Sequence, residues 1–323
     1  MRYVVTGGAG YIGGFMTVRL LEDGHEVIVI DSLERSHIES LDSRLILEQG
    51  NLLDKKFLKN VFTKYKIDAV FHFGGYISVS ESVSKPSAYF ANNFLATLNL
   101  LDQMVESGVE RIIFSSSAAV YGNPTIVPIP ESHPKSPESP YGDSKWMVER
   151  ILHWYFVSNK IRSVALRYFN ASGAALDGSR GEAHDPETHI IPLAIAAAMK
   201  GTTFTLFGSD YETKDGTCVR DYIHVLDLVE AHVLSLKKIE KDAGSFAYNV
   251  GTGSGYSNQE IVDMVRQVSG KTLDVALKER RAGDPGELIA KVDLIKKDLG
   301  FNPKFSDLQT VIGSAWKWHS KKA

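Results

Sequence analysis

The feature that most constrains this chain is a glycine-rich loop near its start, which follows a short apolar run, Tyr3–Val5. The loop, residues 6–13 (TGGAGYIG), leads into residues 12–22, whose apolar positions have helical spacing. Glycines permit a tight turn and a close approach of the backbone to a ligand, and the first turn of a helix offers free N–H groups to a phosphate. The pattern predicts a strand–loop–helix unit that binds a diphosphate. Its spaced glycines are Gly7, Gly10 and Gly13.

An acidic residue stands where such a unit would bind a ribose. Asp31 ends the second apolar run, Val27–Ile30, about 20 residues beyond the loop. A carboxylate there can bind both ribose hydroxyls and repels a 2′-phosphate, so we expect NAD rather than NADP. Arg35 lies nearby, and we interpret it as a solvated loop charge rather than a ligand of a 2′-phosphate.

Apolar runs alternate with amphipathic stretches through the first half of the chain. Ala69–Phe73, Arg111–Ser115 and Ser163–Arg167 continue the series. This alternation is typical of α/β folds, and strands apolar at every position are expected where both sheet faces are covered. We therefore predict a Rossmann-type, doubly wound parallel sheet.

The alternation loosens after about residue 170. Residues 171–189 are predicted to form a loop, Ile190–Lys200 a helix, and Phe204–Phe207 a short strand. We predict an NAD-binding Rossmann domain over residues 1–169, to which 224–251 return, and a smaller, partly interleaved α/β domain for the substrate over 170–323.

Composition narrows the class of protein. The chain has 323 residues, one cysteine and a formal net charge of −3. One cysteine excludes an intrachain disulfide and a multi-cysteine zinc site, and the charge gives no reason to expect nucleic-acid binding. The N-terminus lacks the apolar segment of a signal peptide, and no apolar run is long enough to cross a membrane. We expect a cytoplasmic protein.

A tyrosine and a lysine are placed for acid–base chemistry. Tyr141 and Lys145 are four residues apart at the start of a predicted helix, which puts both side chains on one helical face. An ammonium beside a phenol favours the phenolate and lowers the pKa of the phenol from about 10, and a positively charged nicotinamide would lower it further. The pair predicts a general base that works near neutral pH.

A run of hydroxyls follows the apolar run Arg111–Phe114. The carboxyl ends of strands in open α/β sheets face the ligand crevice, so Ser115, Ser116 and Ser117 are expected there. A serine hydroxyl at this point can hydrogen-bond the substrate oxygen whose proton Tyr141 removes. Ordinary turn serines are the alternative interpretation.

Together these motifs resemble the extended short-chain dehydrogenase/reductase family, and within it the sugar-nucleotide 4-epimerases. The resemblance covers nearly the whole chain. The segment Arg220–His224 (RDYIH) and the pair Arg281 and Asp284 are more specific to the epimerases than the earlier motifs. The resemblance implies an NAD-dependent enzyme that inverts C4 of a UDP-hexose, plain or N-acetylated, through a 4-keto intermediate.

The resemblance also implies residue roles. The catalytic residues would be Tyr141, Lys145 and Ser117. The cofactor would be bound by Gly7, Gly10, Tyr11, Ile12, Gly13, Asp31, Ser32, Leu33, Asn51, Leu52, Phe73, Gly74, Gly75, Asn92, Tyr141, Lys145 and Phe169. The UDP-sugar would be bound by Ser117, Tyr141, Asn170, His189, Arg220, Arg281 and Asp284.

Four positions depart from the usual pattern or bear on the choice of sugar. Asn51 stands where relatives carry Asp, although its amide oxygen can still accept the bond from adenine. Ile77 and Ser80 differ in a loop on the cofactor side. Leu288 lies near the position that gates the sugar pocket in relatives.

Other functions stay open. Sugar-nucleotide dehydratases and decarboxylases share the fold, but they carry acidic residues where this chain has Ala118 and Ala119. A 4-epimerase of a UDP-uronate or UDP-pentose is an alternative, and so is a non-catalytic protein that senses NAD. The segment His184–His189 (HDPETH) is rich in metal-ligating residues, but its spacing matches no recognised metal site, so we favour a substrate loop and expect no metal.

The predicted helix after Lys145 is apolar on more than one face. Its residues include Trp146, Val148, Leu152, Trp154 and Val157. One face can cover the sheet and another can meet a second subunit. The resemblance likewise implies a homodimer through helices of this region, although packing within one chain would explain the same pattern.

Overall fold

The computed structural model describes residues 1–36, 38, 41–280 and 284–322. Its centre is a seven-stranded sheet in the order β11-β6-β5-β4-β1-β2-β3, with every neighbouring pair parallel. The strands are β1 (Arg2–Thr6), β2 (Glu26–Asp31), β3 (Ile46–Gln49), β4 (Ala69–His72), β5 (Arg111–Ser117), β6 (Arg162–Tyr168) and β11 (Ser245–Val250). The chain order reverses between β1 and β4, which opens a crevice at their carboxyl ends. This arrangement confirms the predicted doubly wound parallel sheet.

Both faces of the sheet are buried. Val4 and Val70 pack into the core on one face, whereas their neighbours Val5 and Phe71 pack into the core on the other. The first face is covered by α2 (Lys55–Lys64), α5 (Ala96–Glu106) and α6 (Pro140–Asn159), and the second by α1 (Tyr11–Glu22), α8 (Val225–Lys241) and α10 (Asp293–Leu299). Burial on both faces explains why inner strands such as β2 and β4 contain continuous apolar runs, without the alternation of a half-exposed strand.

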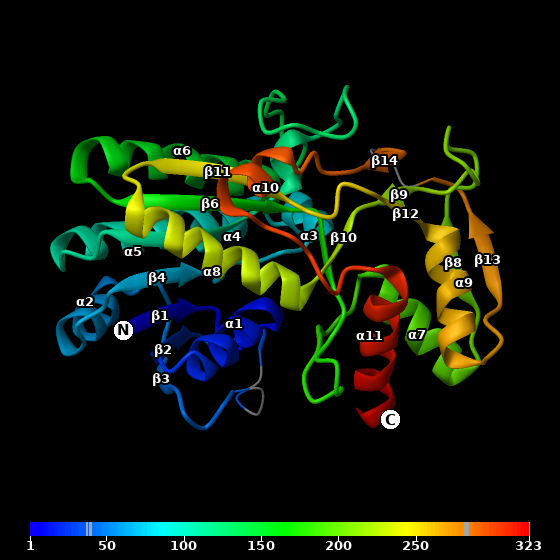
Figure 1. Cartoon of the computed structure of the whole chain (residues 1–323), viewed down its shortest axis with the longest axis horizontal. Coiled ribbons are helices and arrows are strands. Elements are labelled where there is room, and N and C mark those ends of the chain that lie inside the picture. Colours follow the sequence, from blue (N-terminus) through cyan, green and yellow to red (C-terminus); the bar gives the residue numbers. More distant parts are fainter. Residues whose placement is uncertain (37, 39–40, 281–283, 323) are drawn as a thin grey trace.

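A second region lies beside the large sheet (Figure 1). Its helices α7 (Ile190–Lys200), α9 (Asn258–Ser269) and α11 (Leu308–Lys322) surround a separate apolar core together with Phe204. The parallel pair β8 (Phe204–Phe207) and β13 (Val275–Lys278) closes this core. These bounds confirm the predicted helix over 190–200 and the strand over 204–207.

The chain passes between the two regions more than once. After β6, the short strand β7 (Asn170–Ser172) pairs with β10 (Tyr222–His224), and α8 and β11 then return to the large sheet. A small three-stranded sheet is built from β12 (Tyr256–Ser257), β9 (Val219–Arg220) and β14 (Glu287–Leu288). The second region is therefore interleaved with the sheet instead of following it. None of the described helices is long and apolar enough to cross a membrane.

Candidate active site

The glycine loop lies between β1 and α1 on the wall of a cavity of about 870 Å³. Gly7 has a φ of +69°, and a Cβ there would lie 2.7 Å from the backbone nitrogen of Gly74. A Cβ at Gly13 would lie 2.2 Å from the carbonyl oxygen of Gly7. Both contacts are with backbone, which cannot move aside, so only glycine fits at these positions. Gly10 caps α1 without a side-chain hydrogen bond, which leaves the helix N-terminus open to a ligand.

Asp31 lies at the end of β2, on the wall of the same cavity. Its carboxylate accepts hydrogen bonds from the backbone nitrogens of Ala9 (3.0 Å) and Leu33 (2.9 Å), which fix it beside the glycine loop. Arg35 is not simply solvated, as the sequence suggested. Its guanidinium pairs with Glu81 at 2.7 Å and lies 3.8 Å from the centre of the Tyr76 ring. Its charge is thus already neutralised, which agrees with a preference for NAD.

Tyr141 and Lys145 are carried by the first turns of α6. Ser139 caps this helix by accepting a hydrogen bond from the Gly142 backbone nitrogen, and Pro140 begins it. The Lys145 Nζ lies 5.8 Å from the centre of the Tyr141 ring and donates to the carbonyl oxygen of Ser115 at 2.8 Å. The helix therefore places both side chains at the carboxyl end of β5, on the wall of the large cavity.

The titration of this pair differs from the sequence expectation. Burial raises the pKa of the Tyr141 phenol, and its hydrogen bond with Ser117 only partly offsets the rise. Burial also lowers the pKa of Lys145 to about 8. The expected lowering of the phenol pKa is therefore absent in the protein alone, because the desolvation of Tyr141 outweighs its hydrogen bond with Ser117. A further positive charge beside the phenol would be needed to favour the phenolate.

Further polar residues surround the pair, and the sequence did not single them out. The Asn93 Oδ1 accepts from the Tyr76 backbone nitrogen at 2.8 Å, and its amide group donates to the Ser144 hydroxyl. The hydroxyl of Tyr168, at the end of β6, donates to Ser115, and both residues line the large cavity. Only the fold reveals that the Tyr168 hydroxyl faces the crevice.

Most of the predicted cofactor residues line this cavity. The lining includes Gly7, Gly10, Tyr11, Ile12, Gly13, Asp31, Ser32, Asn51, Leu52, Phe73, Gly74, Gly75, Asn92, Tyr141 and Lys145. Three predicted residues lie just outside the lining. Leu33 follows Asp31 with a positive φ of 58°, Phe169 packs partly buried against two core clusters, and Ser117 meets the Tyr141 side chain.

A smaller cavity of about 540 Å³ lies on the side of the second region. Asn170, His189, Arg220 and Asp284 all line it. The Arg220 guanidinium forms an ion pair with Asp284, so the carboxylate holds the cation in place. Arg281 lies outside the residues that the structure describes.

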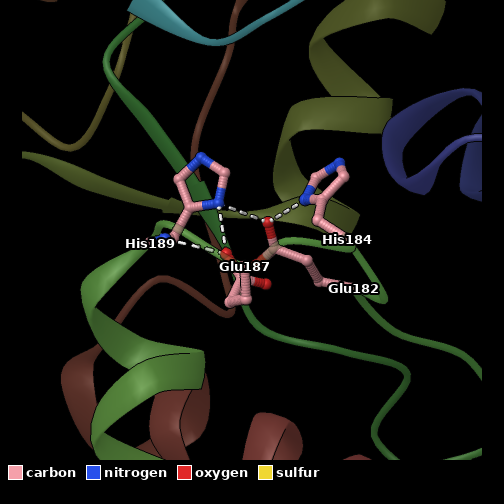
Figure 2. Close-up of side chains that lie close together, drawn as sticks. All are labelled: Glu182, His184, Glu187 and His189. Atoms are coloured by element: carbon pink, nitrogen blue, oxygen red, sulfur yellow. Dashed lines mark hydrogen bonds and ion pairs between the residues drawn. The ribbon is translucent and has the colours of Figure 1, made fainter. Parts of the chain in front are cut away.

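His189 and Thr188 line both cavities and so lie where the two meet. The His189 ring contacts two carboxylates, those of Glu182 and Glu187 (Figure 2). Burial acts to lower the pKa of this imidazole, but its hydrogen bonds with the two carboxylates outweigh burial and raise the pKa to about 10. Glu182 was missed by sequence reasoning because it stands alone in a glycine-rich loop.

One residue of the segment Arg220–His224 (RDYIH), Asp221, has a structural role. Asp221 is fully buried, and its carboxylate accepts hydrogen bonds from the backbone nitrogens of Thr252, Gly253 and Ala290. This residue therefore ties together the loop after β11 and the segment after β14. Neighbouring Arg220 reaches the cavity instead.

The fold and the site define a dinucleotide-binding α/β protein with a Tyr-x3-Lys pair at the crevice of its sheet. The chain belongs to the NAD dependent epimerase/dehydratase family, whose model matches residues 3–251. It is 45% identical to a UDP-glucose 4-epimerase of Lacticaseibacillus casei, over 99% of this chain and 97% of that protein.

Solved structures agree with this family. A UDP-glucose 4-epimerase from Brucella ovis in complex with NAD superimposes with a TM-score of 0.94 at 43% identity, covering 98% of this chain and 97% of the other. The UDP-Glc/GlcNAc 4-epimerase of Campylobacter jejuni gives a TM-score of 0.87 at 36% identity, covering 99% of each chain.

Proposed function

We propose that this protein is an NAD-dependent epimerase that inverts C4 of a UDP-hexose through a 4-keto intermediate. The observation that carries the proposal is the convergence of Tyr141, Lys145 and Ser117 at the end of β5, beside the cavity that the glycine loop borders. The relatives' activities support it. The single cysteine fits a reducing, cytoplasmic setting, which we include in the proposal.

The residues of the larger cavity fit NAD. Gly7 and Gly13 leave no room for a Cβ, so the backbone can approach a pyrophosphate closely, and Asp31 offers a carboxylate to a ribose. When bound, NAD would supply the reversible oxidation of the sugar at C4. In this proposal residues 1–169, with 224–251, bind the cofactor, and residues 170–323 bind the UDP-sugar.

The chain's own residues would handle the proton and the substrate. The Tyr141 oxygen removes the proton of the 4′-hydroxyl and later returns it, while Ser117 hydrogen-bonds the same sugar oxygen. Lys145 adds positive charge beside the phenol. Arg220, held by Asp284, binds the UDP diphosphate, so the keto sugar can turn over while its nucleotide stays anchored.

Turnover of the purified protein tests the proposal. UDP-galactose and UDP-N-acetylgalactosamine are each incubated with the protein, without added NAD, and the C4 epimers are separated. We expect epimerisation of at least one substrate. No epimer from either, even with NAD added, would overturn the proposal and direct attention to UDP-uronates and UDP-pentoses.

Tyr141→Phe tests the assigned base. The variant keeps the ring but lacks the oxygen that takes the proton, so we expect kcat to fall by about 10²–10⁴-fold. Tyr65→Phe is the matched control, because Tyr65 lies at the end of α2, where its hydroxyl donates to Glu48 of β3, and it takes no part in the site. Full activity in Tyr141→Phe would show that another group is the base.

We also propose a homodimer through the outer faces of α5 and α6. The two helices pack side by side, and Tyr155 of α6 donates a hydrogen bond to Asp102 of α5. Val148 and Leu152 of α6 are buried against the sheet, but Trp154 is 61% exposed and Val157 47% exposed. Large apolar side chains gathered on one exposed surface support a subunit contact there.

A further inference from the structure

Four metal-ligating side chains meet in the loop that joins β7 to α7. They are Glu182, His184, Glu187 and His189, and their ligand atoms all lie within 4.8 Å of one another. Figure 2 shows that both imidazole rings present one nitrogen to the carboxylates and turn the other away. The four side chains come from eight consecutive residues, so the folding of this one loop assembles the cluster.

Three of the distances within the cluster are close to those of a tetrahedral ligand set. The Glu182 Oε1 lies 2.8 Å from the Nδ1 of His184 and 2.8 Å from the Nδ1 of His189, and the Glu187 Oε1 lies 2.9 Å from the latter. Tetrahedral Zn²⁺ with bonds of 2.0–2.1 Å separates its ligand atoms by about 3.3 Å. These three pairs need to move apart by only about half an ångström to admit an ion, by the same bond lengths. The remaining pairs of ligand atoms lie within 4.8 Å of one another.

Charge and burial favour a cation at this point. With both imidazoles deprotonated, as ligation requires, the two carboxylates give the cluster a charge of −2, which a divalent ion neutralises. The Glu182 side chain is only 8% exposed, whereas those of His184 and His189 are 28% and 45% exposed, so the cluster has a buried floor and an open side. An ion can therefore enter without unfolding the loop.

We propose that these four residues form a binding site for a divalent transition metal ion of the Zn²⁺ type. Two imidazole nitrogens and two carboxylate oxygens suit Zn²⁺, whereas Mg²⁺ and Ca²⁺ take oxygen ligands alone. The spacing of His184–His189 in the sequence matched no known site because Glu182, the buried ligand, lies outside that segment. The fold supplies it.

The position of the site indicates a structural role. Thr188 and His189 line both cavities, so an ion bound here would fix the segment between the cofactor side and the substrate side. The alternative is a hydrogen-bonded cluster without metal, in which the two carboxylates hold a protonated His189 against the diphosphate of the UDP-sugar.

Metal binding to the untagged protein distinguishes the two. After treatment with a chelator, the protein is titrated with Zn²⁺ by calorimetry and with Co²⁺ by visible absorption. We expect one ion per chain, with the d–d bands of a tetrahedral Co²⁺ site and without a thiolate charge-transfer band. Binding of less than one equivalent in both titrations would overturn the proposal and leave the metal-free cluster.

Single-ligand variants locate the site. His184→Ala and Glu187→Gln each remove one ligand from the exposed side, and we expect each to weaken Zn²⁺ binding by about 100-fold, since even residues behind metal ligands contribute 10–100-fold. His153→Ala, an exposed histidine on α6, is the matched control and should bind Zn²⁺ normally. Unchanged affinity in both ligand variants, or loss of binding only in Cys218→Ser, would overturn the proposal. These readouts do not depend on epimerase activity.

Discussion

Lys145 is nearly completely buried, and its ammonium has the Ser115 carbonyl as its hydrogen-bond partner. Burial lowers the pKa of this ammonium from the usual 10.5 to about 8, which means that keeping the charge inside the folded protein costs stability. A cost of this kind is typical of functional sites, where a charge is held in place for chemistry. Lys145 thus serves the site and lowers the stability of the folded protein.

We therefore expect Lys145→Met to raise the free energy of unfolding at pH 7, by about 1–2 kcal/mol after allowance for the unpaired Ser115 carbonyl. The folded protein loses the Lys145 proton near pH 8, whereas the unfolded chain loses it near pH 10.5. The free energy of unfolding of the wild type therefore increases as the pH rises from 8 to 10.5. Denaturant titrations across this range should show the advantage of the variant shrinking as pH rises. A constant difference across the range would contradict the assignment. Epimerisation should be impaired throughout.

At the scale of elements, the start of α6 sets the geometry of the site. Ser139 ends the extended segment and caps the helix that carries Tyr141 and Lys145. The start of α9 has an equivalent cap, Ser257, in a capping box with Glu260. Of these two helices, only α6 carries residues of the proposed active site, so comparing the two caps separates an effect on stability from an effect on activity.

Ser139→Ala should lower the free energy of unfolding by about 1 kcal/mol, because a backbone N–H of the first turn loses its partner. It should also reduce kcat, since Tyr141 lies two residues from the cap. Ser257→Ala should cost a similar amount of stability or more, with kcat unchanged. Urea unfolding and initial rates measure both quantities. Equal kcat in the two variants would show that the cap does not position the tyrosine.

The elements also show what the sequence can and cannot predict. The central strands and the glycine loop were predictable, because burial on both faces and tight turns leave a local pattern. The edge strand β3 (Ile46–Gln49) was missed because it is half polar and its pairing with β2 is not encoded locally. Other features depend on contacts between residues far apart in the sequence, which the spacing of residue types does not reveal. They are the ion pair of Arg220 with Asp284, the pairing of Arg35 with Glu81 and the burial of Glu182.

At the scale of the whole molecule, the proposed dimer makes a direct prediction. Trp154→Glu places a charge in the centre of the exposed face of α6, where a subunit contact would have to bury it. Light scattering after gel filtration should give the mass of a dimer for the wild type and of a monomer for the variant. Leu277→Glu, on an exposed strand of the other region, is the control. A monomeric wild type would refute the dimer.

The interleaved path of the chain has a consequence for its synthesis. β6 lies beside β11 in the finished sheet, yet the two are separated by the whole of α7 to α8 in the chain. On the ribosome, β6 is thus an open edge with unpaired backbone groups until Ser245–Val250 emerge. The apolar face that α8 and α10 cover also waits for them. The nucleotide-binding region is encoded first, but it completes its fold only when nearly all of the chain has been made. We therefore expect its nascent form to be prone to aggregation for most of translation.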